Sequence, residues 1–268
     1  MAYMAPVFIS HGSPLLLLGP SSARSFLADW GKSAPRPKAI IAVSAHFETD
    51  RPVVVSDPNP GMIYDFYGFP RELYRMQYPA PGDPALAKRI AERLAEAGLA
   101  PAIAPERGYD HGTWVPLLIG YPEADIPVVQ LSVQPEKGAA HHFRLGKALA
   151  PFADEGVLIY GSGSMTHNLY ELERESLDAV GVRPIQPWAA SFADWMGEKL
   201  AAGDTDALVD YRRQAPNAKR NHPSEEHILP LFVALGAAGK GARGQLMHAS
   251  GQHGVLRMDA FSFDKMAA

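Results

Sequence analysis

The chain has 268 residues, 47% of them hydrophobic, which is enough to bury a sizeable core in one compact domain. Its formal net charge of −4 excludes the strongly basic surface of a nucleic-acid-binding or membrane-surface protein, so we expect small-molecule partners. Cysteine is absent, which excludes disulfides, thiolate metal sites and cysteine nucleophiles. A metal ion would therefore have to be held by His, Asp or Glu.

The start of the chain has no basic signal-like segment. The longest aliphatic run, residues 15–18, is far shorter than the roughly 20 residues that cross a bilayer. No repeat or linker divides the sequence. We therefore expect a cytoplasmic protein with no membrane and no nucleic-acid partner.

Runs of apolar and β-branched residues predict strands that are buried on both faces of a sheet. In chain order, these strands cover residues 7–10, 39–45, 52–55, 126–133 and 156–163. Amphipathic or apolar stretches predict helices over residues 83–98, 138–152, 187–202 and 223–238, and a late pair of strands at 244–250 and 255–263. This order predicts an α/β fold, with a mostly parallel central sheet flanked by helices on both faces, in a single domain over residues 1–268.

Several histidines follow the ends of predicted strands. His11 and His46 each come directly after a strand, and His167 comes four residues after another. His111 lies in the loop YDHGTW, just before an apolar helix. Any one of them alone is explained as a half-buried structural histidine. Because ligands of α/β sheets collect beyond the carboxyl ends of the strands, we expect these imidazoles to converge, and such nitrogen donors suit Fe(II) or Zn(II).

A further histidine lies in the predicted helix over residues 223–238. His227 opens the apolar stripe that continues through Leu231, which is an unusual place for a titratable group unless it has a partner such as a metal. Glu225 and Glu226 fall in the first turn of this helix, where negative charge is favourable. Helix-terminus electrostatics therefore explain these two acids without any function.

The remaining histidines give weaker signals. His141 and His142 are neighbours on a predicted helix and point in different directions, so we expect them to be surface or packing residues. His248 and His253 lie on or beside the late strand pair and carry no further signal, although His248 could reach a pocket.

Five motifs occur in order along the chain: VFISHGSP, VSAHFE, GYDHGTW, GSMTHNL and HPSEEHILPLF. Together with DFYGFPRELYRMQYPAPG and IPVVQLSV, they resemble the class III extradiol ring-cleaving dioxygenases, and most closely the DOPA 4,5-dioxygenase branch of that superfamily. The resemblance runs over nearly the whole chain. It implies a non-haem Fe(II) site that can also bind Zn(II), and a reaction that opens the ring of a catechol with O2.

The resemblance also implies roles for individual residues. His11 and His46 match two metal ligands supplied from strand ends. His227 matches the third ligand, with Glu226 as the alternative, because helical geometry disfavours both pointing at one ion. His167 matches the acid/base residue and is a further candidate ligand when zinc is bound. His111 matches a second catalytic pocket histidine that hydrogen-bonds oxygen or substrate.

Several questions stay open at this point. The aromatic segment over residues 63–70 either walls a flat substrate or fills space beside the sheet. Arg71, Arg75 and Lys219 are all candidates to hold a substrate carboxylate, and the substrate could be DOPA, caffeate, a catecholamine or a simpler catechol. A zinc-dependent hydrolase and a non-catalytic metal-binding protein are the alternative functions. A homodimer is one assembly that the sequence leaves open.

Overall fold

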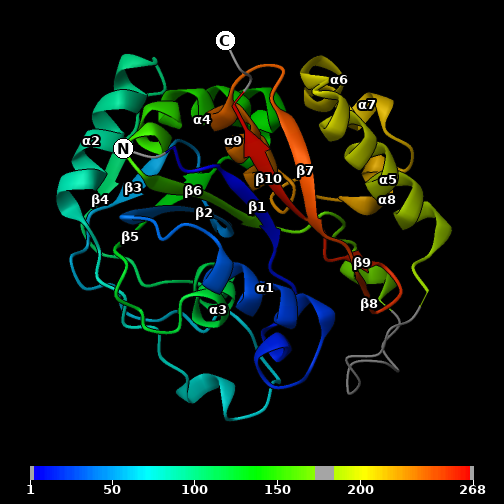
Figure 1. Cartoon of the computed structure of the whole chain (residues 1–268), viewed down its shortest axis with the longest axis horizontal. Coiled ribbons are helices and arrows are strands. Elements are labelled where there is room, and N and C mark those ends of the chain that lie inside the picture. Colours follow the sequence, from blue (N-terminus) through cyan, green and yellow to red (C-terminus); the bar gives the residue numbers. More distant parts are fainter. Residues whose placement is uncertain (1–2, 173–183, 266–268) are drawn as a thin grey trace.

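The structure of the chain is a computed structural model that describes residues 3–172 and 184–265. The strands of its main sheet are β1 (Val7–Ser10), β2 (Ala39–Glu48), β3 (Val53–Val55), β4 (Ala102–Ala104), β5 (Val128–Val133), β6 (Val157–Gly163), β7 (Arg243–His248) and β10 (Ala260–Asp264). They lie side by side in the order β4-β3-β5-β2-β6-β1-β10-β7 (Figure 1). A separate two-stranded sheet pairs β8 (Gly251–Gln252) with β9 (Leu256–Arg257).

The centre of the main sheet is parallel. β2 pairs in parallel with β5 and β6, and β6 pairs in parallel with β1, whereas β10 and β7 add antiparallel strands at one side. Ser162 of β6 lies opposite Ile9 on one side and Ser44 on the other. This register brings the carboxyl ends of β1, β2 and β6 to one edge of the sheet.

Helices cover both faces of the sheet. Those of the chain are α1 (Ser22–Ser33), α2 (Pro84–Glu96), α3 (His111–Gly120), α4 (Gly138–Asp154), α5 (Pro187–Ala202), α6 (Thr205–Val209), α7 (Tyr211–Gln214), α8 (Ala218–Asn221) and α9 (Leu229–Ala238). Figure 1 shows α2, α4 and α9 on one side of the sheet and α1 and α3 on the other. Ile41 and Val43 of β2 belong to the core under the first group, and Ile40 and Ala42 to the core under the second, as alternation along a strand requires. The predicted α/β fold is confirmed.

The start of α2 shows how a polar side chain satisfies a free backbone N–H group at a helix terminus. Asp83 accepts a hydrogen bond from Leu86 N at 2.9 Å and caps α2, and Pro84 is the first residue of that helix. Across the described ranges, no helix combines the length and the apolar character needed to cross a membrane.

The predicted strand over residues 255–263 is divided into β9 and β10, and three boundaries near the candidate site also differ from the sequence-based expectation. The helix predicted over residues 223–238 begins only at Leu229, because its polar start forms turns and α9 is buried on every side. His227 therefore lies in the turn before the helix, not on its apolar stripe. β2 continues beyond Ala45 to Glu48, so His46 lies within the strand, and His111 is the first residue of α3, not part of a loop.

Candidate metal centre

His11 directly follows β1, and one nitrogen of its ring contacts a neighbouring side chain. Its main-chain N–H donates to Gly163 O at 2.9 Å, and its Nδ1 lies 3.1 Å from the Ser162 hydroxyl. That hydroxyl donates its own hydrogen to the carbonyl of Gly112, so it can only accept from His11. The ring proton of His11 is therefore on Nδ1, and Nε2 carries an unused lone pair.

His46 presents the same ring nitrogen to the same point. Its Nδ1 lies 3.4 Å from Asp65 Oδ2, and its Nε2 lies 3.1 Å from Nε2 of His11. With a carboxylate beside Nδ1, the proton stays on Nδ1, and the two Nε2 lone pairs face each other, which is repulsive without a cation. Nitrogens that share one ion at roughly 2.1 Å lie roughly 3 Å apart when they are adjacent ligands. The pair fits a metal ion.

His227 supplies a third nitrogen from the turn before α9. Its Nδ1 lies 2.8 Å from Glu226 Oε1, and its Nε2 is buried with no hydrogen-bond partner among the described residues. A buried polar atom without a partner is costly, and a metal ion would remove that cost. One ligand atom from each of His11, His46 and His227 lies within 4.8 Å of the others. Glu226 Oε1 faces the Nδ1 side of the ring, and ligand atoms of His167, Glu226 and His227 also lie within 4.8 Å of one another.

The backbone holds His227 in place by a close approach to β6. The N–H of Ser164 donates to His227 O at 2.8 Å, and a Cβ added to Gly163 would lie 2.0 Å from the same oxygen. Real side chains do not approach a carbonyl so closely, so only glycine fits here. Gly163, which ends the segment GVLIYGSG, therefore leaves room for the backbone of His227.

The three nitrogen donors are neutral at pH 7. Burial lowers the pKa of His11 and of His227 well below the usual value, and neighbouring histidines lower it further. Burial also lowers the pKa of His46 to about 4. Neutral imidazole is the form that binds metals, so the site is ready for a cation without losing protons.

His167 lies against the ring of His227. The two ring centroids are 3.3 Å apart and the planes differ by 13°, while Nδ1 of His167 lies 3.9 Å from Glu226 Oε1. Burial, followed by the charges of nearby histidines, lowers the pKa of His167 to about 3. The ring is therefore neutral at pH 7.

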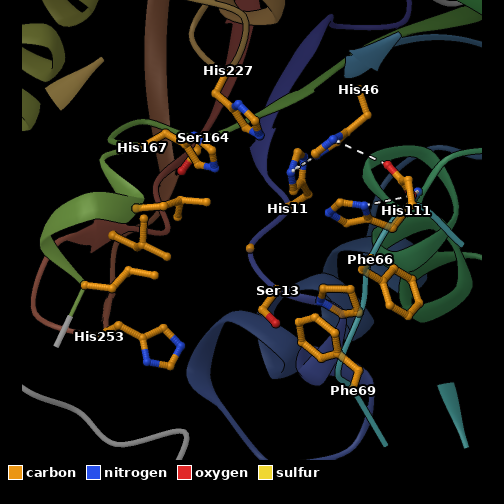
Figure 2. A pocket seen from close by; sticks show the side chains of 16 residues that line it. His11, Ser13, His46, Phe66, Phe69, His111, Ser164, His167, His227 and His253 are labelled. Atoms are coloured by element: carbon orange, nitrogen blue, oxygen red, sulfur yellow. Dashed lines mark hydrogen bonds and ion pairs between the residues drawn. The ribbon is translucent and has the colours of Figure 1, made fainter. Parts of the chain in front are cut away.

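His111 joins the same group from the first turn of α3. Its ring centroid lies 4.0 Å from that of His46 and 5.3 Å from that of His11. Figure 2 shows His111 beside His46, with His227 and His167 on the other side of His11. The structure thus brings together all five histidines that the sequence analysis singled out.

Asp65 is a site residue that the sequence analysis missed. Its Oδ1 lies 2.9 Å from His111 Nδ1, and its Oδ2 is the oxygen that faces His46 Nδ1. Burial raises the pKa of Asp65, but the hydrogen bonds and charge of His111, with the charge of His46, outweigh burial and lower it to about 2. The sequence feature that could have indicated Asp65 is that it is the single acidic residue within the aromatic segment over residues 63–70.

An ion pair between Arg107 and the buried Asp110 lies behind His46 and His111. Arg107 Nη2 donates to His46 O at 3.1 Å and lies 3.1 Å from Asp110 Oδ2. Asp110 Oδ1 accepts hydrogen bonds from the Ser44 hydroxyl at 2.6 Å and from Thr113 N at 3.1 Å, so the same side chain caps α3. This network ties the end of β2 to the start of α3, and hence His46 to His111.

The histidines form one end of a cavity of about 300 Å³. Phe66 and Phe69 line it, while Tyr67 is 90% exposed, so the aromatic segment acts partly as a pocket wall and partly as surface. Figure 2 shows these two phenylalanines and Ser13 beyond the histidine cluster. Arg71, Arg75 and Lys219 are not among the described residues that line this cavity.

The other histidines lie mostly outside the cavity. His142 is buried between Gly138 O and Gln134 N, and His141 contacts the Gln134 side chain, which agrees with their predicted packing role. His248 stacks on Phe26 and is not among the described cavity residues, so it does not reach the pocket as suggested. His253 lines the cavity, a placement that the sequence analysis did not indicate.

Comparisons with known proteins place this geometry in a family. Residues 7–255 match the family described as the catalytic LigB subunit of aromatic ring-opening dioxygenase. A protein of Beta vulgaris named 4,5-DOPA dioxygenase extradiol is 45% identical over 96% of this chain and 95% of its own. Proteins of the same name are 43% identical in Portulaca grandiflora (98% of this chain, 97% of the relative) and 40% identical in Escherichia coli K12 (87% and 85%).

The fold is shared as well. The crystal structure of an uncharacterised protein from Escherichia coli K12 superposes with a TM-score of 0.80 at 33% identity, and the match covers 97% of this chain and 99% of that one. These matches confirm the family resemblance and the predicted enzyme class, an extradiol ring-opening dioxygenase, and that family is metal-dependent. Matched over nearly its whole length, the chain belongs to the LigB family of aromatic ring-opening dioxygenases.

Proposed function

We propose that the chain binds one Fe(II) ion through His11, His46 and His227 and uses O2 to open the ring of a DOPA-like catechol. The observation that carries the proposal is the convergence of three neutral imidazoles: Nε2 of His46 lies 3.1 Å from Nε2 of His11, and Nε2 of His227 is buried with no hydrogen-bond partner among the described residues. Three protein ligands leave coordination positions for a substrate and for O2. When bound, the iron supplies electron transfer and a docking point for both catechol oxygens.

The protein side chains then handle protons and orientation. We assign the general-base role to His167, because its ring stacks on that of the candidate ligand His227 and is thus placed to take a proton from a catechol bound beside the metal and later return it. His111 has its Nδ1 against Asp65, so its other nitrogen is available to hydrogen-bond substrate or oxygen. Zn(II) is the alternative occupant, with His167 as an additional candidate ligand.

The cavity supports a flat aromatic substrate. Its volume of about 300 Å³ is at the small end for ligand pockets, and Phe66 and Phe69 provide apolar walls next to the histidines. Because the relatives at 40–45% identity are named for DOPA, we take DOPA as the first substrate to test. The homodimer, the cytoplasmic location and the absence of nucleic-acid and membrane partners stay predictions.

The deciding experiment is anaerobic reconstitution with Fe(II), followed by DOPA and then air. We expect oxygen uptake and a yellow ring-opened product that carries both atoms of labelled O2. His248→Ala is the matched control, because it removes a histidine outside the cavity and should leave turnover unchanged. Oxygen uptake at background with DOPA, caffeate, dopamine and catechol would reject the proposal. Hydrolysis that needs Zn(II) and no O2 would favour the hydrolase instead.

A further inference from the structure

We propose that Asp65 is a positioning residue that holds the metal ligand His46 and the catalytic histidine His111 with one carboxylate. Metal affinity and turnover would then depend on the same side chain, through two different rings. The turnover half of this inference rests on the proposed dioxygenase reaction, whereas the metal-affinity half rests only on the proposed metal-binding role of His46.

The two carboxylate oxygens of Asp65 are divided between the two rings. Oδ1 accepts a hydrogen bond from the main-chain N–H of His111 at 3.0 Å and lies 2.9 Å from Nδ1 of the same residue. Oδ2 lies 3.4 Å from Nδ1 of His46. The carboxylate therefore accepts one main-chain hydrogen bond and lies within 3.4 Å of one ring nitrogen of each histidine.

This arrangement fixes which ring nitrogen faces the site. An imidazole whose Nδ1 meets a carboxylate oxygen carries its proton there, and its Nε2 is left for a metal or a substrate. Carboxylates in this position orient metal-binding histidines and raise their basicity. Loss of the Asp65 charge would let both rings turn, although the ring centroids of His46 and His111 are only 4.0 Å apart and constrain each other.

The two rings come from elements that are otherwise separate. His46 belongs to β2 and His111 to α3, and Asp65 reaches both from the loop that also carries Phe66 of the cavity wall. Asp65 thus connects the metal ligand, the second pocket histidine and the substrate wall. A direct-ligand role is the competing explanation, because ligand atoms of His46, Asp65 and His111 also lie within 4.8 Å of one another.

The first test measures metal binding and does not need the reaction. We expect Asp65→Asn to weaken Zn(II) binding by about 10- to 100-fold in a chelator competition, while the stoichiometry stays at one ion per chain. Glu72→Gln is the matched control, since it makes the same chemical change at an exposed position on the neighbouring loop and should bind Zn(II) like wild type. Unchanged affinity in Asp65→Asn would overturn the inference. A second ion per chain in wild type, lost in Asp65→Asn, would show a ligand instead.

The second test is a double-mutant cycle in turnover at saturating Fe(II). If Asp65 acts through His111, Asp65→Asn lowers kcat by about 10- to 100-fold in wild type but causes little further loss in His111→Ala. The weakening of Zn(II) binding should persist in His111→Ala, because it passes through His46. Losses in kcat that simply multiply would overturn the link to His111.

Two controls keep the outcomes separable. Thermal unfolding of the metal-free variants checks that they are folded. If Asp65→Asn fails to fold, Asp65→Glu replaces it, because it keeps the carboxylate. We expect the Zn(II) affinity and kcat of Asp65→Glu to lie between those of wild type and those expected for Asp65→Asn. If wild type shows no dioxygenase activity, the proposed function fails, but the Zn(II) measurement still decides the role of Asp65.

Discussion

At the scale of single residues, the nitrogen that each histidine offers to the centre is set by what its other nitrogen contacts. Nδ1 of His11 meets a hydroxyl that can only accept, Nδ1 of His46 meets Asp65, and Nδ1 of His227 meets Glu226. Each contact retains the proton on Nδ1 and leaves Nε2 free. The site is therefore built from three rings and their three partners, because a ligand ring that could rotate would bind metal less well.

The distinction between candidate metal ligands and the residues beside them predicts different metal contents for their variants. We expect His11→Ala, His46→Ala and His227→Ala to lose bound iron, because each removes one of three donor nitrogens. His111→Ala should keep iron and lose turnover, and Glu226→Gln should retain iron with reduced affinity. Metal content per chain, measured beside the rate with DOPA, separates these classes. Equal metal loss in His111→Ala and His11→Ala would contradict the assignment, and an empty Glu226→Gln with a full His227→Ala would reverse the third ligand.

The sequence predicted the histidines but not their partners. Each histidine carries a recognisable signal, since His11, His46 and His167 lie at or just after buried strands. Asp65 carries no such signal, because its two ring contacts are made with residues 46 and 111, which are distant in sequence. Only the folded chain shows that a loop acid reaches both a strand and a helix terminus.

At the scale of elements, the start of α9 shows tertiary packing overriding the local sequence pattern. The pattern of residues 223–238 suits a helix, yet its first six residues form turns, and the helix itself is buried all round. Tertiary contacts decide the boundary: Ser164 N–H binds His227 O, and Gly163 leaves room for that oxygen. His227 thus reaches the site because two elements approach closely.

A methyl group at Gly163 should break this approach. A Cβ there would lie 2.0 Å from His227 O, so we expect Gly163→Ala to destabilise the protein by at least about 1–3 kcal/mol and to lower metal content. Gly197→Ala is the matched control, because Gly197 lies inside α5 and the nearest atom to its added Cβ is 4.0 Å away. The control should gain about 0.5–1 kcal/mol in stability. Urea unfolding and metal content test both, and a Gly163→Ala protein with wild-type values would contradict the argument.

At the scale of the whole molecule, sheet register explains why histidines separated by 35 residues or more share a site. β1, β6 and β2 are adjacent and parallel, so residues beyond Ile9, Ser162 and Ser44 emerge at one edge. The sequence predicted these strands but could not predict their order, which arises from pairing between distant segments. The antiparallel β10 and β7 extend the sheet beside β1, away from the candidate metal centre.

Buried neutral histidines outside the candidate metal centre make the stability of the molecule depend on pH. His142 is fully buried; its Nδ1–H donates to Gly138 O at 2.7 Å, and its Nε2 accepts from Gln134 N at 3.0 Å. Burial lowers the pKa of His142 to about 3, although the bond to Gly138 raises it in part. Protonation would turn the Nε2 acceptor into a donor that faces another donor.

The sign of the effect follows from the two pKa values. In the unfolded chain His142 has a pKa of about 6.5, so below that pH the unfolded chain binds a proton that the folded chain refuses until about pH 3. The contribution to the free energy of unfolding is thus complete above pH 6.5 and is lost as pH falls toward 3, by up to about 1.4 kcal/mol per pH unit. In metal-free protein, His142→Gln should flatten urea-derived stability between pH 6.5 and pH 4.5 relative to wild type. His141→Gln, at a neighbouring half-buried ring, should change the slope less, and parallel curves for wild type and His142→Gln would mean that His142 titrates normally in the fold.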